Sequence, residues 1–397
     1  MLPLSLLQGL NYEEILSVNF TASLAAFIQK YFLLFAANAL FGKVMEDTLL
    51  AATFSKTVSR VLGKEKAVYG AMLATALMAY GGISVFVIVF TVYPILLLTF
   101  KEADLPGRFI PGVIMSSTCT FALGMLPGSA QLNNVIPTTY IDTTPAAAFW
   151  PGIAGTLVSI LGIHFYFHYL FTKARQNGEH FIMTEEVKKR IAQNEKNSDV
   201  NPIFSGLPLL LILALINWFK IDLSCAVLCG TVLALLIGWQ NLENPLRTLN
   251  EGIRTVGSSV ITNAAPVGFG GAILSTVGAK IILTEIVELP INALFSLSLA
   301  AGFAGLLTGS GGGGCDVAMR LLSNQYLGLG VPPQLLHRIV VMATAAFSCL
   351  PHNGMLLLIQ DICGATTKES YLPVLFGTVL NGIVCLLVTM GVGLWLC

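Results

Sequence analysis

Two long apolar regions of this chain each contain a motif that interrupts a membrane-spanning helix. The first motif is Leu126-Pro127-Gly128-Ser129-Ala130-Gln131-Leu132-Asn133-Asn134, and the second is Leu350-Pro351-His352-Asn353-Gly354. An interrupted helix leaves backbone N–H and C=O groups without partners, at several kcal/mol for each group in hydrocarbon. Such interruptions persist only where protein surrounds them or where they line a polar cavity. A pair at corresponding positions in two halves indicates a transport site.

The composition places these motifs in an integral membrane protein. Only 11% of the 397 residues are charged and 55% are hydrophobic, whereas a soluble domain carries about 25% charged residues. The net charge of zero gives no electrostatic indication of a nucleic-acid partner. The glycine run 309–314 is followed by Cys315-Asp316 and not by Lys-Ser/Thr, so it is not a phosphate-binding P-loop. We find no enzyme signature and expect no cofactor and no metal.

The apolar runs predict an all-α protein with about ten membrane segments, because they are long enough to cross roughly 30 Å of hydrocarbon as helices. We expect a first membrane repeat over 1–171, a polar linker over 172–202 and a second repeat over 203–397. Basic residues in the linker and around Lys56–Lys66 indicate that both face the cytoplasm. The predicted segments are 22–52, 67–100, 109–126, 145–171, 204–219, 222–239, 256–277, 281–308, 335–362 and 370–397.

Residue spacings indicate that the two halves are repeats. Phe41-Gly42 precedes Gly81 by 39 positions, and Phe269-Gly270 precedes Gly309 by the same 39. Repeats of this kind usually have inverted topology and place the binding site near the bilayer midplane. The segments at 204–219 and 222–239 have no counterpart in the first half, so the first repeat is expected to lack an N-terminal hairpin. The expected interruptions lie at 80–82, 126–134, 308–314 and 350–354.

The side chains at these interruptions predict a site for a small anion. Gly-rich turns expose consecutive N–H groups and helix N-termini carry partial positive charge, so together they bind a carboxylate without a cationic side chain. Amides and hydroxyls add donors that suit a hydroxy-carboxylate, although they can instead serve only to satisfy freed backbone groups at kinks. The candidate substrate-binding residues are Gly128, Ser129, Gln131, Asn133, Asn134, Thr143, Ser310, Gly311, Gly312, His352, Asn353 and Thr366.

Ionisable side chains in apolar surroundings are costly and usually functional. His352 lies within the second motif, and its ordinary pKa near 6.5 suits a proton carrier; a packed histidine bonded to a carbonyl is the competing interpretation. Asp316 and Asp361 are the other candidates to carry a coupling proton or to hold a sodium ion. Arg320, one helical turn after Asp316, is expected to pair with it.

Two adjacent basic residues follow a proline pair in the second half. His337 and Arg338 come after Val331-Pro332-Pro333. Because proline favours the first turn of a helix, we expect both side chains near a helix start at the membrane interface.

Motifs at and beside the interruptions share one family pattern. They are Arg108-Phe109-Ile110-Pro111, Leu126-Pro127-Gly128, Gln131 to Thr139, Thr143-Thr144, Gly309-Ser310-Gly311-Gly312, His337-Arg338, Leu350 to Gly354 and Thr367 to Tyr371. Together they resemble the gluconate permease family of the ion-transporter superfamily, over about residues 11 to 390. The resemblance implies two inverted repeats with re-entrant hairpins, a multi-pass place in the bacterial cytoplasmic membrane, proton symport of gluconate or related hydroxy acids, and a homodimer.

The chain departs from that family pattern beside two interruptions. Phe347-Ser348-Cys349 stands where members often carry an acidic residue, and the 80–86 stretch lacks an aspartate common in gluconate-type members. The expected function is therefore secondary transport of small organic anions, with a proton as the expected coupling ion and the lipid bilayer as environment. The alternatives are a sodium-coupled di- or tricarboxylate carrier and a degenerate carrier that does not transport.

Overall fold

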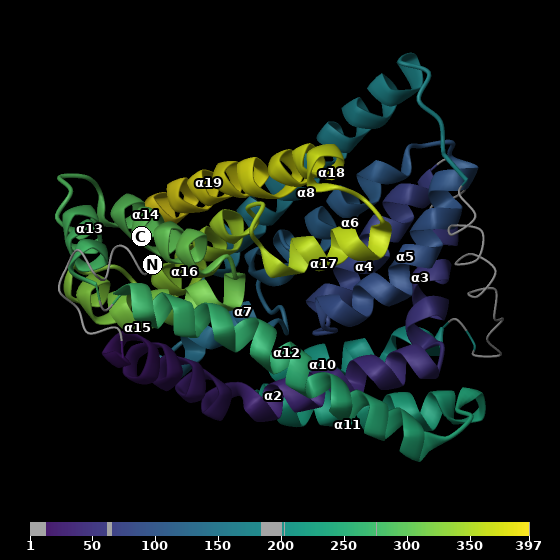
Figure 1. The fold of residues 1–397 in the computed structure, drawn as a ribbon, viewed down its shortest axis with the longest axis horizontal. Helices are drawn as coiled ribbons and strands as arrows, with labels where there is room; N and C mark the ends of the chain where they lie inside the picture. The colour runs from purple at the N-terminus through teal and green to yellow at the C-terminus, as the bar shows by residue number, and fades with distance from the viewer. Residues whose placement is uncertain (1–12, 62–65, 184–200, 202, 275, 397) are drawn as a thin grey trace.

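The computed structural model describes residues 13–61, 66–183, 201, 203–274 and 276–396. This part of the chain folds into helices joined by turns and contains no strand, which confirms the all-α prediction (Figure 1). The first half contains η1 (Glu14–Phe20), α2 (Thr21–Asp47), α3 (Leu50–Val61), α4 (Ala67–Tyr80), α5 (Val85–Glu102), η3 (Gly107–Phe109), α6 (Ile110–Thr118), η4 (Phe121–Met125), α7 (Leu132–Val135), η5 (Ile136–Thr139) and α8 (Phe149–Gln176).

The second half begins with a helical hairpin, as predicted, and continues through broken helices to the C-terminus. Polar caps start several of these helices: Asp222 accepts hydrogen bonds from the first turn of α11, and Asn292 does so for α14. The elements are η6 (Phe204–Gly206), α10 (Leu207–Asn217), α11 (Leu223–Gly238), η7 (Trp239–Asn241), α12 (Pro245–Leu274), α13 (Val277–Val287), α14 (Ala293–Thr308), α15 (Gly311–Gly328), α16 (Pro333–Ser348), α17 (Gly354–Cys363), α18 (Thr367–Val374), η8 (Leu375–Leu380) and α19 (Asn381–Leu396).

The longest packing seam joins α2 of the first half to α12 of the second, and the two helices are antiparallel. Near one end, Gly268 of α12 lies against Phe20, and near the other Gly252 lies against Leu40 of α2. Lys43 Nζ extends the contact, at 2.9 Å from Asp47 and 3.3 Å from Glu251. The α10–α11 hairpin joins this seam, because α11 packs on α2. Together these four helices form the lower layer in Figure 1.

The second interrupted segment of each half packs against helices of the other half. The first-half elements α7 and η5 pack against α15 and α16, whereas the second-half helices α17 and α18 pack against α6 (Figure 1). Two hydrophobic cores result. One contains first-half residues together with α17 and α18, and the other contains α14 to α16 together with residues of η5. The cavity described below lies between them, so both halves contribute to it.

Several predicted segments prove to be two helices each. The run 67–100 divides at Gly81-Gly82 into α4 and α5, and 335–362 divides into α16 and α17, at the expected interruptions. The expectation of one segment over 281–308 is wrong: α13 ends at Val287 and Asn292 caps α14. The glycines 311–314 were expected to form part of an interruption, but they form the first turn of α15. A side chain at Gly314 would lie 2.6 Å from Gly305 Cα of α14, so only glycine permits this packing.

Only some of these helices are long enough to cross a membrane. Within the described ranges, four stretches are long and apolar enough to cross a membrane: Ile15–Asp47, Phe149–Gln176, Leu223–Asn241 and Thr367–Leu396. A pair bent by 90°, Asn263–Ile273 with Val277–Val287, gives a fifth if it is one span. Ala67–Tyr80, Phe204–Asn217, Ala293–Thr308 and Gly354–Cys363 are apolar but shorter. The total of about ten segments remains a prediction.

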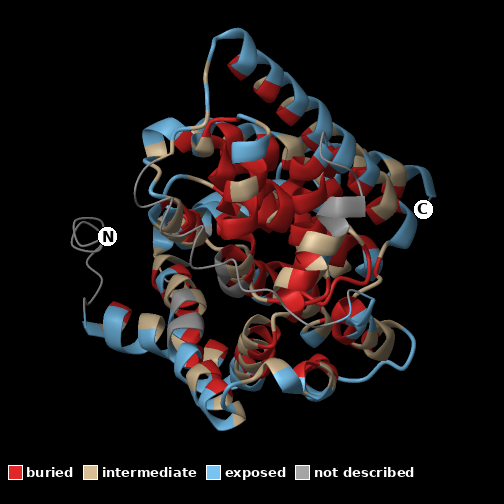
Figure 2. Cartoon of the chain, turned by 90° about the vertical axis from the view of Figure 1, so that its right-hand side faces the viewer, coloured by how far each residue is buried: buried red, intermediate tan, exposed pale blue. Residues whose placement is uncertain are grey.

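The outward face of α8 is apolar although it is exposed. Its inner stripe, including Gly155, Ile163 and Phe167, is buried, whereas Leu161 is 54% exposed and Phe165 is 65% exposed. Figure 2 shows the same division, with buried residues inside and exposed faces on the outer helices. A large exposed apolar face is expected on a helix that contacts lipid.

We predict that Leu161→Lys reduces the amount of protein recovered in the membrane fraction. A lysine at the centre of a spanning helix costs about 2.5–3.5 kcal/mol on insertion scales. Leu161→Ile is the control and keeps the apolar face. Normal membrane recovery of Leu161→Lys, measured by fractionation and immunoblotting, would show that α8 does not face lipid.

Candidate functional site

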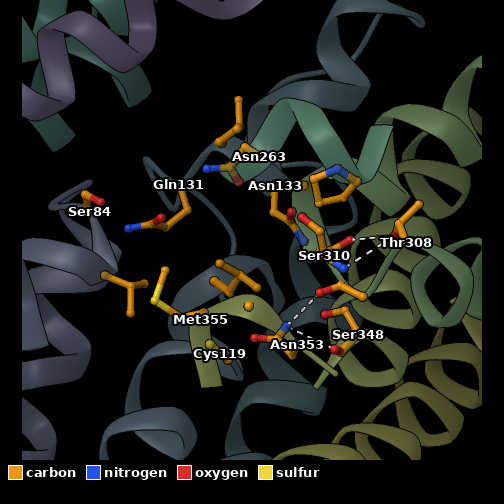
Figure 3. Close-up of a pocket in the computed structure, with 18 of the residues that line it drawn as sticks. Ser84, Cys119, Gln131, Asn133, Asn263, Thr308, Ser310, Ser348, Asn353 and Met355 are labelled. Carbon is orange, nitrogen blue, oxygen red and sulfur yellow. Dashed lines mark hydrogen bonds between the residues drawn. The ribbon is translucent and has the colours of Figure 1, made fainter. Parts of the chain in front are cut away.

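The four interruptions meet at one cavity of about 310 Å³. The first half contributes Gly82 and the stretch from Gln131 to Asn133, and the second contributes Thr308 to Gly312 and Ser348 to Met355, apart from Leu350 and Pro351. Figure 3 shows the amides of Gln131, Asn133 and Asn263 on one side of the cavity and Ser348 and Asn353 on the other. The remaining lining residues are Phe35, Asn38, Ala39, Ser84, Val85, Cys119, Leu123 and Pro266.

Three helices of eight or more residues begin at this cavity. They are α5, α15 and α17, and their N-cap residues Ser84, Ser310 and Asn353 all line it. The Ser310 hydroxyl accepts from Gly313 N at 3.2 Å, and Asn353 Oδ1 accepts from Leu356 N at 2.9 Å. Each helix N-terminus carries the equivalent of about half a positive charge. The cavity is therefore electropositive, although among its described lining residues there is no lysine or arginine.

An amide side chain ties the two interruptions of each half together. Gln131, the N-cap of α7, donates from Nε2 to Ala79 O and, at 3.1 Å, to Ile83 O across the first interruption. Asn353, the N-cap of α17, donates from Nδ2 to Gly309 O at 3.0 Å. These contacts satisfy carbonyl groups that broken helices release. The same arrangement thus occurs once in each half.

Left-handed glycines mark the first interruption of each half. Gly82 has φ +95° and Gly309 has φ +59°, values that glycine adopts without steric cost. The offset of 228 positions between Gly81 and Gly309 also relates the lining residues Phe35 to Asn263 and Asn38 to Pro266. Asn38 and Asn263 were not among the predicted site residues, because they lie inside the long helices α2 and α12. The repeat offset does not single them out, because it pairs Asn38 with Pro266 and Asn263 with Phe35.

Two polar atoms of the cavity wall are buried without a hydrogen-bond partner. They are Asn133 Nδ2, a donor, and Asn38 Oδ1, an acceptor. Asn133 is only 2% exposed, and a Cβ on Gly311 would lie 3.1 Å from its Nδ2, which places the amide at the start of α15. An unpaired buried polar group costs about 1–3 kcal/mol. A ligand with complementary groups would recover this cost.

The neighbouring Asn134 is fully engaged in structure instead. Its Nδ2 donates to Ser129 O at 3.0 Å and to Pro145 O at 2.9 Å, and its Oδ1 accepts from Arg338 Nη1 at 2.9 Å. The second ring nitrogen of His337, Nε2, lies 3.3 Å from the same oxygen. Asn134 therefore joins the first-half interruption to α16.

His337 and Arg338 lie in the first two turns of α16, as predicted, and both side chains are fully buried in protein; their place at the membrane interface stays a prediction. The Arg338 guanidinium donates to Ala147 O at 2.6 Å, to Pro145 O at 3.0 Å and to Gly124 O. The proline pair does start α16 as expected, but α16 enters the protein interior directly. Arg338 thus holds the 145–147 turn and the end of η4 in place.

Besides Asn134, four predicted substrate residues lie outside the cavity lining. Ser129 is buried and donates to Ala122 O at 2.7 Å, and Gly128 O accepts from Asn217 Nδ2 at 3.1 Å. Thr143 Oγ1 lies 2.9 Å from His337 Nδ1. Thr366 is exposed and forms a capping box with Glu369 at the start of α18. Of the predicted substrate residues, Gln131, Asn133, Ser310, Gly311, Gly312, His352 and Asn353 line the cavity.

The three titratable candidates lie in different surroundings. His352 lines the cavity, and its Nε2 lies 3.0 Å from Leu306 O. Asp316 is buried one and a half turns along α15 and is 4.0 Å from Lys30 Nζ, so its ion pair is with α2, while Arg320 is exposed. Asp361 is exposed near the end of α17.

Comparison with known proteins shows which family the chain belongs to. The chain is 30% identical over 395 residues to the uncharacterized transporter YxjC of Bacillus subtilis strain 168, covering 89% of this chain and 84% of that protein. The chain belongs to this transporter's family. No family model matches it. Relationship to a transporter agrees with an all-helical fold whose long helices are apolar.

A second cavity, of about 580 Å³, lies at the other ends of α5 and α17, where its lining includes Tyr93 and Cys363. Two ion pairs lie at this cavity: Arg108 pairs with Glu179, and the lining residue His180 pairs with Asp104 at 2.6 Å. The hydrogen bond from His180 lowers the pKa of Asp104 below its ordinary value. Within the described part of this family member, no group of three or more His, Cys, Asp or Glu is placed to hold a metal ion.

We predict that Arg338→Met lowers the melting temperature of the detergent-solubilised protein strongly. Removing the guanidinium leaves several buried carbonyl oxygens unsatisfied, and at about 1–3 kcal/mol for each group the loss is roughly 3 kcal/mol or more. The exposed Arg320→Met on α15 is the matched control and should change little. Equal melting temperatures for the two variants would contradict this role of Arg338.

Proposed function

We propose that this protein is a secondary transporter of small organic anions, such as gluconate or related hydroxy acids, coupled to protons in the bacterial cytoplasmic membrane. The observation that carries the proposal is the cavity at which α5, α15 and α17 begin and in which the Asn133 amide has no partner. Membership in a transporter family and the resemblance to gluconate permeases support it.

The chemistry of the cavity favours a small carboxylate with hydroxyl groups. The helix N-termini attract negative charge. Asn133 Nδ2 can donate to a carboxylate oxygen, and Asn38 Oδ1 can accept from a substrate hydroxyl. A volume of about 310 Å³ is at the lower end of the range for ligand pockets. A compact anion therefore suits the cavity better than a large one.

The antiparallel course of α2 and α12 supports two inverted repeats. These helices carry the equivalent Phe41-Gly42 and Phe269-Gly270, so opposite directions are what inverted topology requires. Movement of one repeat element against another around a central site would then expose the cavity to each side of the membrane in turn. A homodimer remains part of this proposal through the family resemblance.

Uptake by proteoliposomes tests the function. We predict saturable uptake of at least one of gluconate, lactate, hydroxybutyrate and citrate when a pH gradient, acidic outside, is imposed. Uptake that requires a sodium gradient and survives a protonophore would replace the proton with sodium and favour a di- or tricarboxylate carrier. Absence of organic-acid uptake under either gradient would contradict the proposal and favour a degenerate carrier.

Two adjacent asparagines provide a sharper test of the site. We predict that Asn133→Leu raises KM by roughly 10- to 100-fold, because a hydrogen bond to a charged group contributes about 1.5–3 kcal/mol, without lowering the melting temperature. Its amide N–H group has no partner in the protein, so its loss costs no internal hydrogen bond at that atom.

Asn134→Leu is the matched control and should behave in the opposite way. It removes hydrogen bonds to Ser129, Pro145 and Arg338, so the melting temperature should fall. An unchanged KM in Asn133→Leu would show that the substrate binds elsewhere.

A further inference from the structure

We propose that the Asp316–Lys30 pair is the proton-coupling site, and that an anion bound at the start of α15 promotes protonation of Asp316. The inference rests on the proposed function and deepens it, because it identifies one carboxylate and one mechanism for coupling. Three parts of the fold meet at this pair: α2, α15 and the turn after η5.

The Asp316 carboxylate is buried but well bonded. It is 4% exposed, and its Oδ1 accepts from Tyr140 OH at 2.8 Å and from Tyr31 OH at 3.2 Å. Lys30 Nζ lies 4.0 Å from the same oxygen and 3.6 Å from the centre of the Tyr140 ring. Two hydroxyl donors and one ammonium group stabilise the charged carboxylate in a place where a lone charge would be costly.

The lysine gives this buried pair contact with the surroundings. Its side chain is 33% exposed, whereas that of Asp316 is 6% exposed. Lys30 is therefore the more exposed partner of the pair. Among the residues described, the charged and titratable groups that interact around Asp316 are Lys30, Tyr31, Tyr140, Cys315 and Arg320.

The position of Asp316 on α15 couples it to the cavity. Gly311, at the helix start, lines the cavity, and Asp316 follows five positions later. At 1.5 Å per residue this is a rise of about 7.5 Å. A substrate carboxylate at the N-terminus therefore repels the Asp316 carboxylate, and Coulomb's law at an intermediate dielectric gives a change in proton affinity on the order of tenfold.

Linkage makes this effect reciprocal. If the anion raises the proton affinity of Asp316, protonation of Asp316 raises the affinity for the anion by the same factor. The anion and the proton then bind together, which is what symport requires. Neutral Asp316 no longer attracts Lys30, so the charge attraction between α2 and α15 is lost when the proton binds, which the bound anion promotes.

The contacts of His352 suit the role of the proton-coupling residue less well than those of Asp316. Its Nε2 lies beside Leu306 O, which a histidine N–H can satisfy in the neutral state. Its side chain faces no carboxylate among the ion pairs of the described residues. The buried carboxylate with a cationic partner is at Asp316.

Three proteins test the proposal in proteoliposomes: the wild type, Asp316→Asn and the double variant Lys30→Met/Asp316→Asn. The wild type should concentrate the anion under a pH gradient, and its KM should fall on the order of tenfold as the pH is lowered, because proton and anion binding favour each other. Both variants should still exchange external for internal anion, but neither should concentrate it, and their KM should not depend on pH. Asp142→Asn, which removes an exposed carboxylate near Tyr140, is the control and should concentrate the anion as the wild type does.

Asp316→Asn leaves Lys30 without its charge partner, which can prevent folding. The double variant also removes the lysine, so the test stays valid in that case. Proton-driven accumulation by the double variant would overturn the proposal while leaving anion transport intact. Proton uptake by the wild type on anion binding, followed with a pH dye in weakly buffered solution, is an independent measure, and its absence would also overturn the proposal. No exchange of any organic anion by the wild type would instead refute the proposed function itself.

Discussion

Backbone groups released by broken helices must find partners inside the protein, because lipid offers none. The rest of this structure depends on how that requirement is met at four interruptions. Gln131 and Asn353 donate to carbonyl groups across the interruptions of their own halves. Asn134 and Arg338 bond the turn that follows the first-half motif. These contacts hold three helix N-termini around one cavity, which a set of unbroken helices could not do.

Most polar side chains at the interruptions have hydrogen-bond partners, so the polar atoms without a partner are informative. Nearly every polar side chain at the interruptions is used to satisfy backbone, yet Asn133 Nδ2 and Asn38 Oδ1 are buried in the cavity wall without partners. A buried group of this kind is destabilising when it has no partner, and it is a sign of a ligand or an ordered water. Adjacent residues therefore differ: Asn134 is bonded within the protein, and Asn133, whose Nδ2 has no partner, is the proposed binding residue.

Charge is separated from the cavity in a similar way. In the proposed mechanism the lining attracts anions through helix N-termini and amides, which have no proton to lose near neutral pH. The titratable carboxylate is placed along α15, bonded to Tyr31 and Tyr140. On this proposal, substrate and proton occupy different places and interact through one helix.

The sequence by itself determined the membrane character, the helical class and several of the places where helices break, because apolar runs, proline and glycine act over a few residues. It also predicted which polar segments meet, through the repeat spacing of glycines. Only the tertiary structure decided which polar groups have a hydrogen-bond partner within the protein and which have none. Asn133 and Asn134 are alike in sequence, and Arg338 read as an interfacial residue. Their partners lie far away along the chain: Arg338 meets Asn134 across 204 positions, and Tyr31 meets Asp316 across 285. Contacts at that separation depend on how the two halves pack together, and no local pattern of residues specifies them.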